Sequence, residues 1–475
     1  MRNHIMSTRQ RALSTLLLFS ISALFLGCEK LPKPSEEALE TLEMAESGDM
    51  DAQYKLAEMY NNGEGVPQDD KESVMWYRKA AEQGHGEAQV RLGSYYFCVS
   101  EDDIEAVKWF RKAAEQGNAE AQYWLGAMYD FGQGVVEDDK EAVKWYRKAA
   151  EQGDAEAQRK LGEMYSHGNG APQDYQQAVK WYTMAAEQGD AYAQFALGDI
   201  YVRGDSDLFN YKEGVKWYTK AAEQGNAEAQ YWLGAMYDFG QGVVEDDKEA
   251  LKWYTKAAEQ GHSSAQYYLA IMYTDGEGVS VNNKEAAKWY HKAAEQGRAG
   301  AQKDLGYMYL RGIGVLKDEN EAFKWFTKAA EQGLSDAQNT LGDMYAQGNG
   351  VSKNYEEAVK WYVKAANQQL SEAQNNLGMM YSMGWGVRQD YKEAVKWWTK
   401  AAEWNNANAQ LRLGLKYAEG LGVIEDYVQA YKWLVLAGKN GEEQAASAKE
   451  DLRNRMTPEQ IAEAQKLAKE FDENQ

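Results

Sequence analysis

Cysteine and proline are scarce in this chain of 475 residues, which has two Cys and five Pro. Two cysteines are too few for the disulfide framework that stabilises small extracytoplasmic domains, and so little proline excludes a collagen-like chain. Hydrophobic residues make up 44% of the sequence and charged residues 27%, which are globular proportions. We therefore expect a folded protein that is stabilised by packing and not by cross-links.

Basic residues are outnumbered by acidic residues. The chain has 52 Lys+Arg against 74 Asp+Glu, and its formal net charge is -22. Binding to nucleic acid needs a concentrated cationic surface that neutralises phosphates. The charge therefore argues against nucleic acid as a partner.

Motifs of metal binding and catalysis are also missing from the sequence. The histidines beyond residue 27 have no metal-ligand spacing, and the chain contains no His-Glu-x-x-His. It contains neither Ser-x-x-Lys nor Lys-Thr-Gly, two motifs of penicillin-binding enzymes. We predict that the protein is not an enzyme and uses neither metal nor cofactor.

The first 27 residues are typical of a targeting segment. Three arginines precede an uncharged, apolar stretch over residues 12–27, which is shorter than the ~20 residues that span a bilayer and suits a secretory signal. Residues 24–28, Leu-Phe-Leu-Gly-Cys, resemble the lipobox of bacterial lipoproteins. The resemblance implies removal of residues 1–27, lipidation of Cys28, and a short tether over residues 28–34. The alternatives are an uncleaved anchor helix or an ordinary signal peptide with an incidental cysteine.

A sequence repeat fills most of the remaining chain. Eleven copies of the dipeptide Ala-Gln follow one another at a spacing of 36 residues, with one spacing of 33, and a tryptophan recurs with each of these copies. Within each copy, apolar residues follow helical spacing in two stripes, and glycines separate the stripes. Each repeat is therefore predicted to be a pair of amphipathic helices.

The architecture follows from the repeat. A single helix pair cannot bury its apolar faces, so stacking of neighbours must create the core. We predict an all-α fold, a right-handed superhelical α-solenoid of about eleven 36-residue helix-turn-helix repeats over residues 52–444. A capping helix is expected over residues 35–51, and further capping helices over residues 445–475.

The consensus of the repeat points to a family. It reads Ala-Gln-x-x-Leu-Gly-x-Met-Tyr-x-x-Gly-x-Gly-Val, followed by Glu-Ala-Val-Lys-Trp-Tyr-x-Lys-Ala-Ala-Glu-Gln-Gly. This pattern resembles the Sel-one-like repeat, a relative of the tetratricopeptide repeat. The resemblance implies a scaffold or adaptor that binds other proteins.

Candidate binding residues are expected where the consensus leaves positions open, on the face of the first helix opposite the core stripe. In tetratricopeptide-like solenoids that face lines the concave groove. In the fifth to eighth repeats it carries an aromatic ridge of the kind that protein interfaces use as anchors. The ridge and its apolar neighbour comprise Phe195, Tyr231, Tyr267, Ile271 and Tyr307. Alternatively, these rings merely pack between neighbouring first helices.

The combined observations favour a scaffold anchored in the bacterial cell envelope. We expect a monomer that binds proteins or peptides and is attached to the membrane through an acyl anchor at Cys28. Glu29 follows the anchor cysteine where an inner-membrane retention signal has Asp, so we favour the outer membrane, facing the periplasm. One alternative is a cell-wall-acting enzyme that hydrolyses peptidoglycan or β-lactams, and another is a secreted or surface virulence factor that engages host proteins.

Overall fold

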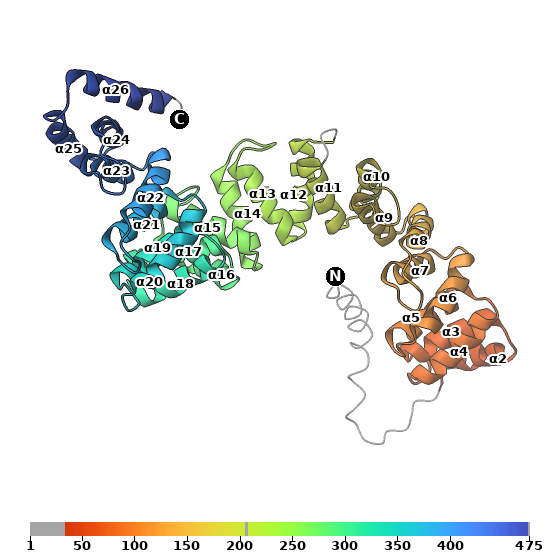
Figure 1. The fold of residues 1–475 in the computed structure, drawn as a ribbon. Helices are drawn as coiled ribbons and strands as arrows, with labels where there is room; N and C mark the ends of the chain where they lie inside the picture. The colour runs from red at the N-terminus through yellow and green to blue at the C-terminus, as the bar shows by residue number, and fades with distance from the viewer. Residues whose placement is uncertain (1–33, 205–207, 474–475) are drawn as a thin grey trace. The chain divides into compact units, whose positions relative to one another are not determined.

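The computed structural model describes residues 34–204 and 208–473. Within these ranges it contains twenty-five helices, α2 to α26, and no strand (Figure 1). The signal segment predicted over residues 1–27 and the lipidation site Cys28 lie outside the described residues. The prediction of an all-α helical solenoid is confirmed.

Each repeat consists of a first and a second helix, nearly all of them 13 residues long. The first helices are α3 (Met50–Asn62), α5 (Gly86–Cys98), α7 (Ala119–Phe131), α9 (Ala155–His167), α11 (Ala191–Arg203), α13 (Ala227–Asp238), α15 (Ser263–Asp275), α17 (Ala299–Arg311), α19 (Ser335–Gln347), α21 (Ser371–Met383) and α23 (Ala407–Glu419). The second helices are α4 (Asp70–Glu82), α6 (Asp103–Glu115), α8 (Asp139–Glu151), α10 (Tyr175–Glu187), α12 (Tyr211–Glu223), α14 (Asp247–Glu259), α16 (Asn283–Glu295), α18 (Glu319–Glu331), α20 (Tyr355–Asn367), α22 (Tyr391–Glu403) and α24 (Tyr427–Lys439).

The chain divides into two compact parts. The N-terminal part comprises the residues up to 229 together with 241–243, and the C-terminal part comprises 230–240 and the residues from 244 onward. From α2 to α12 each helix packs against the next, and the same holds from α14 to α25. Each part is thus a linear stack of helices in which a repeat contacts only its neighbours.

Additional helices flank the repeats. α2 (Glu36–Glu46) packs against α3, and the Ser35 hydroxyl caps it by accepting a hydrogen bond from the backbone N–H of Ala38 at 3.1 Å. At the other end, α25 (Gln444–Arg453) contacts α23 and α24, and α26 (Pro458–Glu473) packs against α24 (Figure 1). These helices cover apolar faces that would otherwise be exposed at the ends of the stack.

Most repeats have a Gly-x-Gly segment that forms the turn after the first helix, and in the eighth repeat this turn packs onto the preceding repeat. Gly312, with φ of 69°, ends α17 in the left-handed conformation. Gly314, with φ of 70°, lies against the start of α16, where a Cβ on Gly314 would be 2.0 Å from the carbonyl oxygen of Asn283. The second glycine of the motif therefore serves close packing between repeats.

The two helices of a repeat approach each other through a small residue and a buried ring. In the third repeat, a Cβ on Gly126 would lie 2.8 Å from Cδ1 of Tyr146, whose side chain is fully buried. The hydroxyl of Tyr146 donates a hydrogen bond to Asp130 Oδ2 at 3.2 Å. Burial raises the pKa of Asp130. The third repeat thus buries one large ring and gives the polar end of that ring a partner.

A ladder of buried glutamines joins the repeats. In the eighth repeat, Gln302 Nε2 donates to the carbonyl oxygen of Ala294 in the preceding repeat at 3.0 Å. Gln332, which follows the second helix, donates from Nε2 to Gln302 Oε1 at 2.7 Å. The Gln of each Ala-Gln dipeptide occupies this buried position in all eleven repeats. The ladder satisfies polar groups at the helix ends that a purely apolar core would leave unpaired.

The tenth repeat interrupts this ladder. Trp404 occupies the position that Gln332 has in the eighth repeat, and 62% of its surface is exposed. Its partner in the ladder, Gln374, is only 3% exposed, yet Gln374 Oε1 has no hydrogen-bond partner. An unpaired buried acceptor costs about 1–3 kcal/mol.

We expect Trp404→Gln to stabilise the protein by about 1–2 kcal/mol, because the new side chain can donate a hydrogen bond to Gln374 Oε1. The measurement is the free energy of unfolding in urea. Trp404→Ala is the matched control, since it removes the exposed ring without adding a donor. If the two variants are equally stable, the missing ladder contact does not limit stability.

Candidate protein-binding face

Half-buried aromatic side chains line the first helices of the C-terminal part. The ring of Tyr231 on α13 stacks on His262 with ring centres 4.7 Å apart, and it lies 5.9 Å from the ring of Tyr254. His262 caps the start of α15 by accepting from the N–H of Ala265. Tyr231 therefore packs between its own repeat and the next first helix.

Tyr267 on α15 reaches the following first helix in the same way. Its hydroxyl donates to Asp304 Oδ2 on α17 at 3.1 Å, and the guanidinium of Arg298 lies 4.5 Å from the centre of its ring. A Cβ on Gly300 would come within 3.3 Å of this ring. Burial raises the pKa of Tyr267 to about 12, and the neighbouring Asp304 adds to the rise. Tyr267 is thus a contact between repeats as well as a surface residue.

The remaining predicted residues are also half-buried. Tyr307 packs edge-on against Phe326 with ring centres 4.8 Å apart, and its hydroxyl is 2.9 Å from Thr340 Oγ1 on α19. Ile271 packs against the core cluster that contains Tyr290. Phe195 belongs to the N-terminal part, where its ring stacks on Tyr218 at 5.8 Å. The structure therefore places all five residues in packing contacts, and their role in binding a partner stays a prediction.

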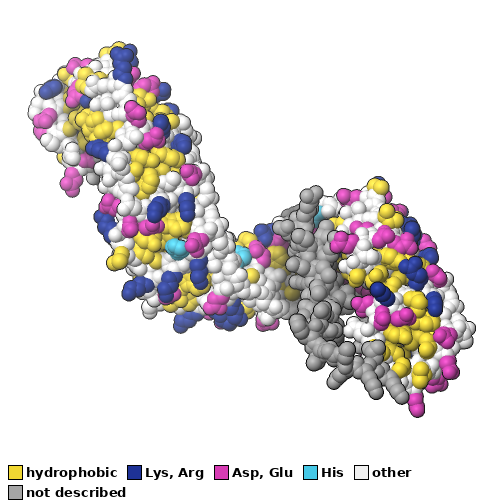
Figure 2. Space-filling model, turned by 90° about the horizontal axis from the view of Figure 1, so that it is seen from below, with side chains coloured by type: hydrophobic (Ala, Val, Ile, Leu, Met, Phe, Trp, Pro, Cys, Tyr) yellow, Lys and Arg dark blue, Asp and Glu magenta, His cyan; other side chains and the backbone are white. Residues whose placement is uncertain are grey.

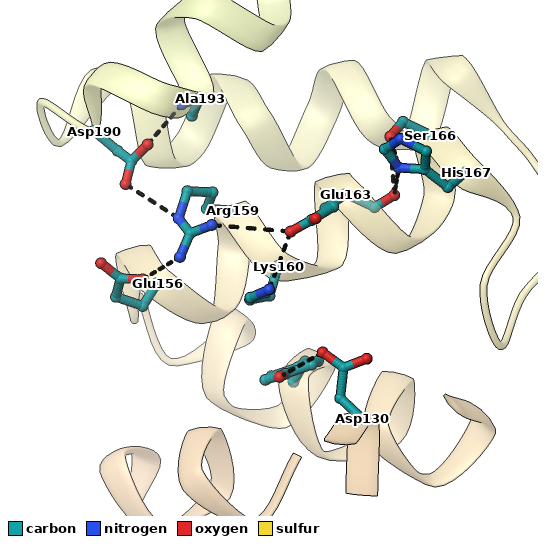
Figure 3. A network of polar contacts seen from close by, with 10 residues as sticks. Asp130, Glu156, Arg159, Lys160, Glu163, Ser166, His167, Asp190 and Ala193 are labelled. Carbon is teal, nitrogen blue, oxygen red and sulfur yellow. Dashed lines mark hydrogen bonds and ion pairs between the residues drawn. The ribbon is translucent and has the colours of Figure 1, made fainter. Parts of the chain in front are cut away.

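Charged residues take the equivalent place in the fourth repeat, within the N-terminal part (Figure 3). Arg159 on α9 pairs with Glu156 at 2.5 Å and with Asp190, the N-cap residue of α11, at 3.5 Å. Lys160 pairs with Glu163 at 3.1 Å, and Glu163 also lies 3.9 Å from Arg159. The guanidinium side chain is only 18% exposed. This network joins α9 to α11 with charges where other repeats use rings.

This network is not among the binding residues predicted from the sequence, although it lies on the same face of the first helix as the aromatic ridge. Arg159 and Glu163 stand at the second and sixth positions after the Ala of their Ala-Gln dipeptide, as Tyr231 and Ala235 do in their repeat. The predicted ridge covers the fifth to eighth repeats. The same positions in the fourth repeat indicate the charged pair.

The molecular surface mixes apolar and charged side chains. In the view of Figure 2, hydrophobic side chains gather in several separate patches, with acidic and basic side chains between them. On the second helices, a lysine covers the recurring tryptophan, as where Lys148 Nζ lies 3.8 Å from the centre of the Trp145 ring. Such a surface offers apolar anchors surrounded by charge, which is the composition of many protein interfaces.

Features for membrane spanning or metal binding are not found among residues 34–204 and 208–473. No helix there is both long and apolar enough to cross a membrane. No group of three or more His, Cys, Asp or Glu side chains in those ranges is arranged to hold a metal ion.

Comparison with known proteins identifies the repeat. A family model described as Sel1 repeat, the repeat that the consensus resembles, matches the chain eleven times between residues 51 and 442. The matched segments are 51–85, 86–118, 119–154, 155–190, 191–226, 227–262, 263–297, 299–334, 335–370, 371–404 and 407–442.

Two solved structures are similar to this chain over most of its length. The structure of a protective antigen present in uropathogenic Escherichia coli strains, which displays an SLR fold, is 37% identical with a TM-score of 0.83 and covers 92% of this chain and 94% of that chain. A Sel1 repeat protein from Oxalobacter formigenes is 34% identical with a TM-score of 0.53, covering 78% of this chain and 100% of that chain. None of the curated proteins compared with the chain matches it.

Proposed function

Because this chain belongs to the Sel1 repeat family, whose members are generally protein-interaction scaffolds, we propose that it is a lipid-anchored scaffold of the bacterial cell envelope. It binds a protein partner on the exposed face of its first helices. It works by positioning that partner near the membrane and without catalysis, in keeping with a family that is typically non-catalytic.

The observation that carries this proposal is the contrast between constant and variable positions on the first helices. The Gln of the Ala-Gln dipeptide is buried in every repeat. The next position changes from repeat to repeat, although the same fold is built each time. The residues at this position are Tyr54, Val90, Tyr123, Arg159, Phe195, Tyr231, Tyr267, Lys303, Asn339, Asn375 and Leu411. Most of these side chains are half-exposed as well as packed, and a surface that differs from repeat to repeat is what recognition of a specific partner needs.

The anchor is proposed from the amino-terminal sequence. Residues 12–27 have the composition of a secretory signal, and Cys28 follows Gly27 as in a lipobox. Residues 29–34 can extend to at most about 20 Å, and α2 begins at Glu36. A diacylated Cys28 would therefore keep the first repeats close to the bilayer and raise their effective concentration toward membrane-bound partners. Glu29 favours the outer membrane, with the chain facing the periplasm.

A second candidate function follows from one of the similar structures. The relative that is 37% identical is a protective antigen of uropathogenic Escherichia coli strains. This favours the possibility that the present chain is displayed at the cell surface, or released, and binds host proteins. Protease treatment of intact cells separates the two candidates, because a chain facing the periplasm is protected and a surface-displayed chain is cleaved.

The proposal predicts that anchoring and partner capture are linked. The test uses cells that produce the full chain with a photo-crosslinking amino acid at Thr274, a half-buried residue on the exposed face of α15. We expect the chain in the outer-membrane fraction with one defined crosslinked adduct. Cys28→Ser should move the chain to the soluble periplasmic fraction and reduce the adduct several-fold, since the local concentration falls.

Two controls belong to this experiment. Cys98→Ser should leave both fractionation and crosslinking unchanged, because Cys98 lies within the repeats. A crosslinker at Lys288, which is exposed on the second helix α16, should give no specific adduct. If Cys28→Ser remains in the membrane, the anchor is elsewhere, and equal adducts from Thr274 and Lys288 would contradict the choice of face.

A further inference from the structure

Exposed aliphatic side chains lie on three consecutive turns of the C-terminal part. Each turn joins the first helix of a repeat to its second helix, and the three belong to the sixth, seventh and eighth repeats. Single exposed apolar residues are ordinary on a protein surface, but a group of them marks an interaction site. This group, the turn ridge, comprises Val244 with 88% of its surface exposed, Val281 with 58%, Ile313 with 37% and Leu316 with 90%.

The three turns are stacked on one another. A Cβ on Gly278, in the turn of the seventh repeat, would lie 2.4 Å from the carbonyl oxygen of Asp247, where the second helix of the sixth repeat begins. A Cβ on Gly314, in the turn of the eighth repeat, would lie 2.0 Å from the carbonyl oxygen of Asn283, where the second helix of the seventh repeat begins. Every residue of the turn ridge stands within three residues of one of these contacts along the chain. The ridge therefore follows one continuous edge of the stack.

The turn itself does not need aliphatic residues. The ninth repeat builds the same turn around two glycines of positive φ. At the positions of Ile313 and Leu316 it has Asn349 and Ser352. Polar side chains therefore suffice to build the turn, and the apolar ones of the ridge are surplus to it.

Acidic side chains gather at one end of the ridge. The turns of the sixth and seventh repeats, residues 239–248 and 275–284, contain five acidic and two basic side chains. Burial raises the pKa of Glu277 on this edge, and the negative charges of four neighbours add to the rise. These neighbours are Asp238, Asp247, Asp275 and Glu245. Because like charges repel, a cation placed among these carboxylates would be stabilised.

The charge also selects the kind of occupant. A second copy of the chain would bring another acidic surface to the ridge, since its formal net charge is -22. A bilayer presents phosphate groups of the same sign as the carboxylates. A protein segment that combines apolar side chains with positive charge matches both features of the ridge.

We propose that the turn ridge binds a cationic, apolar segment of a protein partner. The aliphatic side chains of that segment pack on Val281, Ile313 and Leu316, and its lysine or arginine side chains lie among the acids around Glu277. The ridge lies at the edge between first and second helices. It is therefore a second binding surface, in addition to the first-helix face of the proposed function.

The test is an array of short peptides probed with the full chain in a non-ionic detergent. The peptides combine lysine with leucine, lysine with serine, or glutamate with leucine. We expect the lysine-leucine peptides to bind about tenfold more tightly than the other two classes, because only they supply both charge and apolar surface. High salt should weaken this binding several-fold, since exposed charges are screened.

A ridge variant and a matched control make the test specific. The triple variant Val281→Gln, Ile313→Asn and Leu316→Ser introduces residues that other repeats carry at the same positions. It should lose about tenfold in affinity for the lysine-leucine peptides, while its Tm stays unchanged. Ile424→Ser should change neither, because Ile424 is 90% exposed at the position of Leu316 but belongs to the eleventh repeat.

Several results would overturn the proposal. They are equal binding of the lysine-leucine and glutamate-leucine peptides, equal losses in the triple variant and in Ile424→Ser, and no binding to the array. Flotation of the Cys28→Ser chain with phospholipid vesicles, lost in the triple variant, would overturn it too, by assigning the ridge to the bilayer. The Thr274 adduct tests the first-helix face separately, so the scaffold function can stand when the ridge site is wrong.

Discussion

Gly314→Ala is expected to destabilise the C-terminal part by about 3 kcal/mol or more. Gly314 has φ of 70°, and an added Cβ would lie 2.0 Å from the carbonyl oxygen of Asn283 and 2.4 Å from its carbon. Both atoms belong to the backbone at the start of α16, which cannot rotate away as a flexible side chain could. The alanine therefore forces the turn and the preceding repeat apart, in addition to the strain of a positive φ.

Gly297→Ala is the matched control for this variant. Gly297 also has a positive φ, 88°, but a Cβ added there would meet no atom within 4 Å. Its cost should therefore be the conformational cost alone, about 1 kcal/mol. Urea unfolding of both variants measures the difference, and equal losses would mean that close packing between repeats contributes nothing at Gly314.

The linear arrangement of the repeats determines how the effect of Gly314→Ala should spread. Each repeat contacts only its neighbours, so one damaged interface can open without unfolding the whole chain. We expect faster hydrogen exchange of the amides in α16, α17 and α18 than in α22 to α24. A uniform rise across the C-terminal part would instead indicate that its repeats unfold as one cooperative block.

Periodicity in the sequence was sufficient to predict the helix pairs, and alignment of the repeats also shows where a residue departs from the consensus. Gln369 and Asn405 replace the glycine that follows the second helix, and both adopt a positive φ, 66° and 58°. The segment between the second helix and the next first helix has the same length in every repeat. The residue that replaces glycine must therefore adopt the positive φ that glycine has at this position in the other repeats. Asn tolerates this conformation better than Gln does.

The glutamine ladder could not be predicted from periodicity. The constant glutamine looks like a surface residue next to a core alanine, since glutamine is mostly exposed in folded proteins. Its burial depends on a second glutamine 30 residues further along the chain, which supplies the donor. A contact of that kind appears only when neighbouring helices are placed in space, and so does its loss beside Trp404.

The contacts of the candidate binding residues could not be predicted from periodicity either. Helical spacing places Tyr267 on the face of α15 opposite the core stripe, but the extent of its burial depends on what the next repeat presents. The next repeat presents Arg298, Gly300 and Asp304, all of which contact the tyrosine. Asn375 and Arg412 stand at the corresponding positions of the tenth and eleventh repeats, but no hydrogen bond joins them, and Asn375 Oδ1 and Arg412 Nε are left unpaired.

Tyr267→Ala should therefore destabilise the C-terminal part by about 2–4 kcal/mol, because it removes a half-buried ring, a hydrogen bond and a cation–π contact together. Tyr267→Phe keeps the ring and should cost about 1 kcal/mol for the lost bond to Asp304. The measurement is the free energy of unfolding in urea, with circular dichroism as the probe. A Tyr267→Ala variant as stable as the parent would show that the ring contributes little to packing.

Partner binding by Tyr267→Phe then separates packing from recognition. This variant keeps the fold, so any change in the Thr274 adduct reports on the surface and not on unfolding. If the adduct is unchanged in Tyr267→Phe and lost in Tyr267→Ala together with stability, the ring acts by holding α15 and α17 in register. If the Tyr267→Ala chain is still folded at the temperature of the crosslinking experiment and nevertheless loses the adduct, the ring itself contacts the partner. Only the second result makes the aromatic ridge a binding surface, because a ring that merely fixes the spacing of two first helices affects the partner through their geometry.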